Sequence, residues 1–114
     1  MNTLKLDITE LEIDDKQNQI SERNYDRYFD YNETFKSSII LPTVSNYRTI
    51  NYSEVSSPFA LVVISDKLIN VKVNGNEITN TKMVLMNTAI NSLQIANVDD
   101  SSAVVTIYIW GKQE

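Results

Sequence analysis

The fold class is decided by the stretch Ala103-Val104-Val105-Thr106-Ile107-Tyr108-Ile109-Trp110. Side chains of a β-strand alternate between two faces, so this stretch predicts a strand with Ala103, Val105, Ile107 and Ile109 on one face. The other face carries Val104, Thr106, Tyr108 and Trp110. Because both faces are largely apolar, we expect either a central strand covered on both sides or a strand whose Tyr108/Trp110 face meets another subunit.

Further short segments around this stretch also have the pattern of strands. Phe59–Ser65 is apolar almost throughout, which predicts a central strand covered on both faces. Asn74-Gly75 lies between two alternating segments and predicts a tight hairpin, because a type I′ turn needs positive φ at both central residues. The remaining predicted strands are Phe35–Leu41, Tyr47–Tyr52, Met83–Met86 and Ser92–Ala96.

The N-terminal third is harder to interpret. Leu4, Leu6 and Ile8 alternate with polar residues, whereas Leu11 and Ile13 continue on the opposite parity, so we expect a bulge or bend near Thr9–Glu10, or two short strands. Further along, Tyr25, Tyr28 and Phe29 follow Asn24 at helical spacing, with Asn24 as a possible N-cap. We therefore predict a loop or short helical turn near residues 16–34.

The patterns together predict an all-β protein. About eight or nine short strands, separated by turns every 8–12 residues, are typical of a small antiparallel β-sandwich of jelly-roll-like form. The length of 114 residues and the absence of a low-complexity linker favour a single domain over residues 1–114.

Composition restricts the chemistry. The chain has no Cys and no His, which removes thiolate sites, the commonest general base and the commonest transition-metal ligand. It has two isolated glycines, so no phosphate loop and no dinucleotide fingerprint are present and we expect no cofactor. The acid pairs Asp14-Asp15 and Asp99-Asp100 are interpreted as solvated turns rather than metal sites. A Ser65–Lys67 dyad and a two-carboxylate glycosidase are weaker possibilities, and we predict that the protein is not an enzyme.

The distribution of charge limits the kinds of partner that the protein can bind. The net charge is −5, and residues 1–33 account for all of it with nine acidic against four basic residues. An acidic chain without a basic stripe predicts no nucleic-acid binding, because that affinity comes mainly from Lys and Arg. The longest apolar run, Phe59–Ile64, is far shorter than the roughly 20 residues of a membrane-spanning helix, so we expect no membrane insertion.

Aromatic residues are the best candidates for contacts. Tyr and Trp provide amphipathic contact area that suits protein partners or sugars. We single out Tyr108 and Trp110 on the last predicted strand as an interface, and the cluster of Tyr25, Tyr28 and Tyr31 as a second surface.

The order of these segments resembles a known group of proteins. The apolar strand Ser57-Pro58-Phe59-Ala60-Leu61-Val62-Val63-Ile64, the hairpin at Val71-Lys72-Val73-Asn74-Gly75, the strand Ser92-Leu93-Gln94-Ile95-Ala96-Asn97 and the closing strand Val105–Gly111 are similar to small β-sandwich virion proteins of tailed bacteriophages, found in the head, head–tail junction or tail. The resemblance covers residues 57–111. It implies a location in the virion and assembly into symmetric rings or trimers, and it carries over no active-site residue.

We therefore predict a non-catalytic structural protein that forms a homo-oligomer and contacts other virion proteins. A carbohydrate-binding module that uses surface Tyr52 and Trp110 is the alternative, with a glycan as the partner. A monomer with Tyr108 and Trp110 wholly inside would remove the basis for the first prediction.

Overall fold

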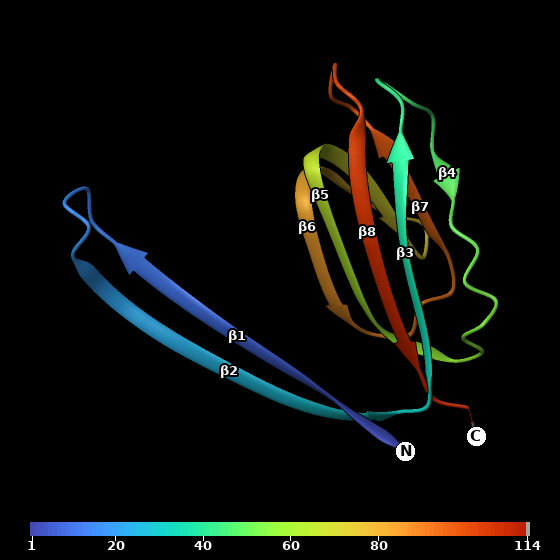
Figure 1. Cartoon of the computed structure of the whole chain (residues 1–114), viewed down its shortest axis with the longest axis horizontal. Helices are drawn as coiled ribbons and strands as arrows, with labels where there is room; N and C mark the ends of the chain where they lie inside the picture. The colour runs from blue at the N-terminus through green and yellow to red at the C-terminus, as the bar shows by residue number, and fades with distance from the viewer. Residues whose placement is uncertain (114) are drawn as a thin grey trace. The chain divides into compact units, whose positions relative to one another are not determined.

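The computed structural model describes residues 1–113, and within them eight strands and no helix are formed (Figure 1). Every strand pair is antiparallel, so the prediction of an all-β, antiparallel, sandwich-like fold is confirmed. The strands are β1 (Asn2–Ile13), β2 (Gln19–Tyr31), β3 (Glu33–Leu41), β4 (Arg48–Thr49), β5 (Pro58–Val73), β6 (Asn76–Asn87), β7 (Leu93–Asn97) and β8 (Ala103–Gly111).

The chain, predicted as one domain over residues 1–114, groups into two compact units. The first, Met1–Tyr31, is a two-stranded hairpin of β1 and β2, which we call the arm. The second begins at Asn32 and holds a six-stranded sheet in the order β3-β8-β5-β7-β4, with β6 also paired to β5. All of the buried core belongs to this second unit, and no residue of the arm is buried.

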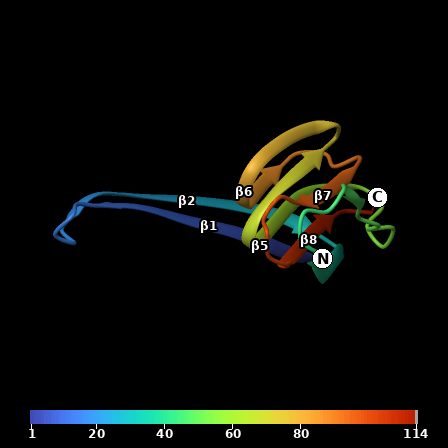
Figure 2. The ribbon, with the colours of Figure 1, turned by 90° about the horizontal axis from the view of Figure 1, so that it is seen from above.

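Strand β5 shapes the second unit. Its first half, Pro58–Ser65, pairs with β8, and its second half, Ile69–Val73, pairs with β7, while β6 follows it on the other edge. Between the halves the Ser65 hydroxyl donates to the Lys67 carbonyl and accepts from the Lys67 N–H, which makes the irregular corner. The sheet therefore curls, as Figure 2 shows for β5 and β6, and the inner side chains close on one another.

The inner face of this sheet is the core that alternation predicts. Ala103, Val105, Ile107 and Ile109 of β8 are all fully buried. Leu61 and Val63 of β5 lie beside Ile109 and Ile107 on the same side of the sheet and are buried too. Ile64, on the opposite side, is 46% exposed. The prediction that Phe59–Ser65 is covered on both faces therefore holds for Ala60, which is 1% exposed beside Trp110, but is wrong for Ile64, where the outer side of β5 is open.

Two features at strand ends, a hairpin turn and a buried amide, stabilise the second unit. Asn74 and Gly75 have φ of 53° and 82°, as the predicted β5–β6 hairpin turn requires. Asn97 is fully buried at the end of β7, where its amide donates to the carbonyls of Pro42 and Ser101 at 2.9 Å. Its side-chain oxygen accepts the Asp99 N–H, so one amide satisfies groups from three segments.

The arm differs from its prediction in two ways. Residues 16–18 lie in a turn, but Gln19–Tyr31 is a strand and not a loop or helical turn, because it pairs with β1 along its whole length. Asn24 is no helix cap, since its side chain accepts a hydrogen bond from Thr9 across the hairpin. No bulge occurs at Thr9–Glu10, and the irregularity lies at Glu12/Ile13 instead. Leu11 therefore projects on the face opposite to Leu4 and Ile8.

Candidate functional site

The outer side of the second unit's sheet carries an apolar surface, which we call the outer sheet face. It is formed by the alternate residues of β3, β8, β5 and β6 that do not enter the core. Directly paired residues lie on the same side of a sheet, so the pairing places the side chains in rows. One row is Lys36, Tyr108, Val62 and Leu85, and the next is Ser38, Thr106, Ile64 and Met83.

Five aliphatic side chains of the outer sheet face are strongly exposed. Their exposed fractions are 68% for Ile40, 46% for Ile64, 66% for Met83, 40% for Leu85 and 47% for Val104. The alternation of β8 predicts the place of Val104 on this surface, whereas the other four residues are not predicted to lie there. The pairing of Met83 with Ile64 and of Leu85 with Val62 places them there, and it joins residues that are 19 and 23 positions apart in the sequence.

Tyr108 and Trp110 lie on this surface, as the alternation of β8 predicts. Both are half-buried, and their rings stack with centroids 5.9 Å apart and an interplanar angle of 18°. The Lys36 ammonium lies 5.8 Å from the centre of the Tyr108 ring, within the range of a cation–π contact. The two predicted interface residues are therefore next to one another on a partly open surface.

The three tyrosines predicted as a second surface are divided by the strand they occupy. Tyr25 and Tyr31 share one face of the arm, whereas Tyr28 lies on the other, where the Lys5 ammonium is 5.8 Å from its ring centre. The face with Tyr25 is the apolar one, and we call it the apolar arm face. Its apolar members are Leu4, Leu6, Ile8, Tyr25, Phe29 and Tyr31.

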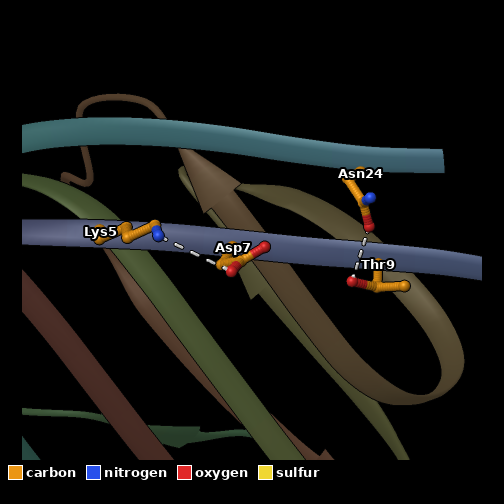
Figure 3. Close-up of polar contacts among 4 residues, drawn as sticks. All are labelled: Lys5, Asp7, Thr9 and Asn24. Carbon is orange, nitrogen blue, oxygen red and sulfur yellow. Dashed lines mark hydrogen bonds and ion pairs between the residues drawn. The ribbon is translucent and has the colours of Figure 1, made fainter.

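The opposite face of the arm is mainly polar and charged, although Leu11 and Tyr28 also lie on it and are 51% and 63% exposed. Lys5 and Asp7 form an ion pair at 3.9 Å, and the Thr9 hydroxyl donates to Asn24 at 3.0 Å (Figure 3). Asp7 also lies directly opposite Asp26, an arrangement of like charges that weakens a hairpin. Because Glu22 and Asp30 share this face and Lys5 is its only cation, it is acidic, whereas the charges on the apolar arm face balance.

A shallow depression of about 460 Å³ lies beside the ring of Tyr52. Asn51, Ser53 and Asn91 supply polar groups to its lining. The Tyr52 hydroxyl donates to the Ile90 carbonyl at 3.4 Å, and burial raises the pKa of Tyr52. The depression thus combines a fixed aromatic ring with exposed amides.

A second polar cluster surrounds Tyr47. Its hydroxyl donates to the Glu77 carboxylate, and the Lys72 ammonium lies 4.5 Å from its ring centre. Desolvation, with the hydrogen bond and the negative charge of Glu77, raises the pKa of Tyr47 to about 12. A phenol with a raised pKa is a poor general base at neutral pH, so this cluster ties β6 to the chain before β4 and has no evident chemistry.

Three of the candidate residues for catalysis or metal binding, Asp14, Ser65 and Asp99, have structural partners. Asp14 and Asp99 each accept backbone N–H groups in their own turns. The Ser65 hydroxyl is bonded to the Lys67 backbone and not to its ammonium. Within residues 1–113, no group of three or more Asp or Glu side chains is placed to hold a metal ion.

Comparisons with protein-family models, with curated proteins and with solved structures find no match to this chain. The resemblance of residues 57–111 to phage virion proteins therefore stays a prediction from the sequence. No helix able to cross a membrane is found among the described residues.

Proposed function

We propose that this protein is a non-catalytic structural subunit that assembles with copies of itself through the outer sheet face, in a phage virion where it also contacts other virion proteins. The observation that carries the proposal is the alignment of Val62, Ile64, Met83 and Leu85 beside Tyr108 and Trp110. Soluble monomers seldom leave such contiguous apolar surface open, so a surface of this kind favours a protein partner.

The composition of the surface supports a protein partner further. Tyr and Trp are enriched at interface centres because they offer large, rigid contact area with one polar end. The stacked Tyr108–Trp110 pair provides such a centre, and the exposed aliphatic residues surround it. The similarity to phage proteins supports the placement in a virion and a symmetric oligomer.

The test of assembly uses Trp110, which is the only tryptophan of the chain. Sedimentation over a range of concentrations should show a closed oligomer, and Trp110 emission should shift to shorter wavelengths as the oligomer forms. Met83→Lys should weaken association by about tenfold or more, because a charge is buried without a partner. Val98→Lys is the control, since Val98 is exposed but lies after β7, outside the outer sheet face.

A monomer at all concentrations, with unchanged Trp110 emission, would reject the proposal. The placement in a virion has a separate test. Genes that flank the coding sequence should encode capsid, portal or tail proteins, and a neighbourhood of metabolic genes would count against it.

The depression beside Tyr52 favours a second candidate, a carbohydrate-binding module. An aromatic ring flanked by Asn51 and Asn91 is suited to a sugar, whose ring stacks while its hydroxyls bond to amides. Titration with oligosaccharides should then show saturable binding that Tyr52→Ala abolishes. Binding lost with Trp110→Ala but kept with Tyr52→Ala would place the sugar on the outer sheet face instead, and no binding to a glycan array would remove this candidate.

A further inference from the structure

We infer that the depression beside Tyr52 binds an uncharged sugar residue and selects it over sugars that carry a carboxylate, sulfate or phosphate group. The inference rests on the second candidate function, carbohydrate binding, and deepens it by naming the class of sugar. It does not depend on assembly through the outer sheet face, because no residue of that face lines the depression.

The depression combines buried apolar residues with exposed polar ones. Its apolar lining residues Ile50, Val55 and Leu93 are all buried. The exposed polar residues of the lining are Thr49, Asn51, Ser53, Asn91 and Ser92. A sugar ring has a similar division, because its C–H faces are apolar and its hydroxyl groups lie at the edge. Such a lining suits a sugar better than a wholly apolar or an ionic ligand.

The ring of Tyr52 is held in place independently of any ligand. It is half-buried and packs against the hydrophobic core, and its hydroxyl donates to the Ile90 carbonyl at 3.4 Å. A ring that is already fixed loses little conformational freedom on binding, so more of the contact energy contributes to affinity. The part of the ring that stays open offers an apolar surface for the C–H face of a sugar.

The segment that carries Asn91 and Ser92 is fixed by Asn74 at the β5–β6 turn. The Asn74 side-chain oxygen accepts the backbone N–H groups of Asn91 and Ser92 at 2.6 and 3.2 Å. Its amide donates to the Ala89 carbonyl at 2.8 Å. These bonds leave the Asn91 and Ser92 side chains without a hydrogen-bond partner within residues 1–113. Two side chains on a fixed backbone are therefore open to a ligand.

The polar side chains of the lining match hydroxyl groups in kind. Asn, Ser and Thr side chains both donate and accept hydrogen bonds, as a sugar hydroxyl does. Thr49 accepts from the Gln94 amide at 3.3 Å, and Asn51 accepts from the Ser53 N–H at 3.1 Å. Both bonds use acceptors, so the Thr49 hydroxyl hydrogen and the Asn51 amide hydrogens stay available for a ligand.

The absence of charge selects among sugars. None of the nine described residues that line the depression is Asp, Glu, Lys or Arg. Burial raises the pKa of Tyr52, so its phenol is neutral at physiological pH. An anionic group would lose part of its hydration here without gaining a cationic partner, which disfavours acidic sugars. Arg48 lines a neighbouring depression of about 290 Å³ instead, together with Phe35 and Ile39.

The experiment compares matched pairs of sugars by titration calorimetry. Each pair holds a neutral oligosaccharide and the same oligosaccharide with one added acidic group, such as lactose and sialyllactose. We expect the neutral member of at least one pair to bind with a Kd at least about tenfold below that of its acidic partner. Asn91→Ala removes an exposed side chain and should weaken this binding by about tenfold, with the melting temperature unchanged.

A change of specificity gives a sharper test. Asn91→Lys places a cation in the lining and should tighten binding of the acidic member by about tenfold or more. Val98→Lys adds the same charge outside the depression and should change this binding by less than about threefold. Both positions are exposed, so neither variant threatens the core.

Each outcome separates the inference from the function on which it rests. No binding by any sugar, neutral or acidic, would remove carbohydrate binding and the inference with it. Acidic members that bind as tightly as neutral ones would keep carbohydrate binding and overturn the inference, and loss of their binding in Arg48→Gln would place the acidic group in the neighbouring depression. Neutral-sugar binding that survives both Asn91→Ala and Tyr52→Ala, or equal effects of the two lysine variants, would also overturn the inference.

Discussion

The arm and the second unit consist of the same kind of strand but differ in how far their apolar residues are buried. Both consist of antiparallel strands with alternating apolar residues, and β1 with 12 residues is longer than β8 with nine. In β8 the alternate residues are fully buried, whereas in β1 even Leu4 and Leu6 are only half-buried. The difference teaches that alternation predicts a strand, but the number of strands that can close over it decides whether a core forms.

The largest expected difference comes from the same substitution in each region. Ile107→Ala removes a fully buried side chain and should lower the free energy of unfolding by about 2–5 kcal/mol. Ile8→Ala, measured on the monomer, should lower it by less than about 0.5 kcal/mol, because Ile8 is exposed. Urea denaturation followed by Trp110 fluorescence measures both values. Similar losses would break the comparison and show that the arm belongs to the cooperative unit.

Loss of the buried amide of Asn97 should have the second-largest effect on the free energy of unfolding. Asn97→Ala leaves the carbonyls of Pro42 and Ser101 without a donor and should cost about 2–4 kcal/mol of unfolding free energy. Asn24→Ala also removes a side-chain hydrogen bond, but an exposed one in the arm, and should cost less than about 1 kcal/mol. Thermal melts of the two variants should differ clearly, and equal melting temperatures would contradict the assigned role of Asn97.

Substitution of the two glycines, both in the second unit, should give a smaller difference in unfolding free energy. A Cβ at Gly111 would lie 2.3 Å from the Val55 side chain and 2.8 Å from the Ser57 carbonyl oxygen, so Gly111→Ala should cost about 1–3 kcal/mol. Gly75 has open space around it and only its φ of 82° opposes a side chain, so Gly75→Ala should cost about 1 kcal/mol. Chemical denaturation measures the loss of unfolding free energy for both variants. A larger loss for Gly75→Ala would mean that Val55 and Ser57 move easily to make room for a side chain at residue 111.

The smallest effect concerns the turn of the arm and depends on pH. The backbone N–H groups of Asn18 and Lys16 donate to the Asp14 carboxylate and hold its pKa below the usual 3.8. The charged form is thus favoured in the folded turn, so its stabilisation is present above about pH 4 and is lost as pH falls through the lowered pKa. The amide resonance of Asn18 should shift over this range, and in Asp14→Asn the shift should disappear.

Much of the second unit follows from local pattern. The alternation of Ala103–Trp110 predicts both the buried face and the position of Tyr108 and Trp110, and Asn74-Gly75 predicts the turn that is found. The strands of the arm do not follow from local pattern alone, because Tyr25, Tyr28 and Phe29 fit a helical spacing as well as Tyr25, Phe29 and Tyr31 fit a strand. Pairing with Leu4, Leu6 and Ile8 resolves this choice in favour of the strand, and such pairing is a long-range property.

The sequence by itself therefore determines the class of structure, all-β and antiparallel, together with the inner face of β8 and the β5–β6 turn. These features depend on period-2 alternation and on backbone preferences of neighbouring residues, which are local. Only the tertiary structure decides that β2 is a strand, that the core lies wholly beyond the arm, and that Ile64, Met83 and Leu85 join Trp110 on one open surface. Those features depend on which strands pair, and pairing joins residues that are far apart in the sequence, such as Leu4 with Phe29 and Ile64 with Met83.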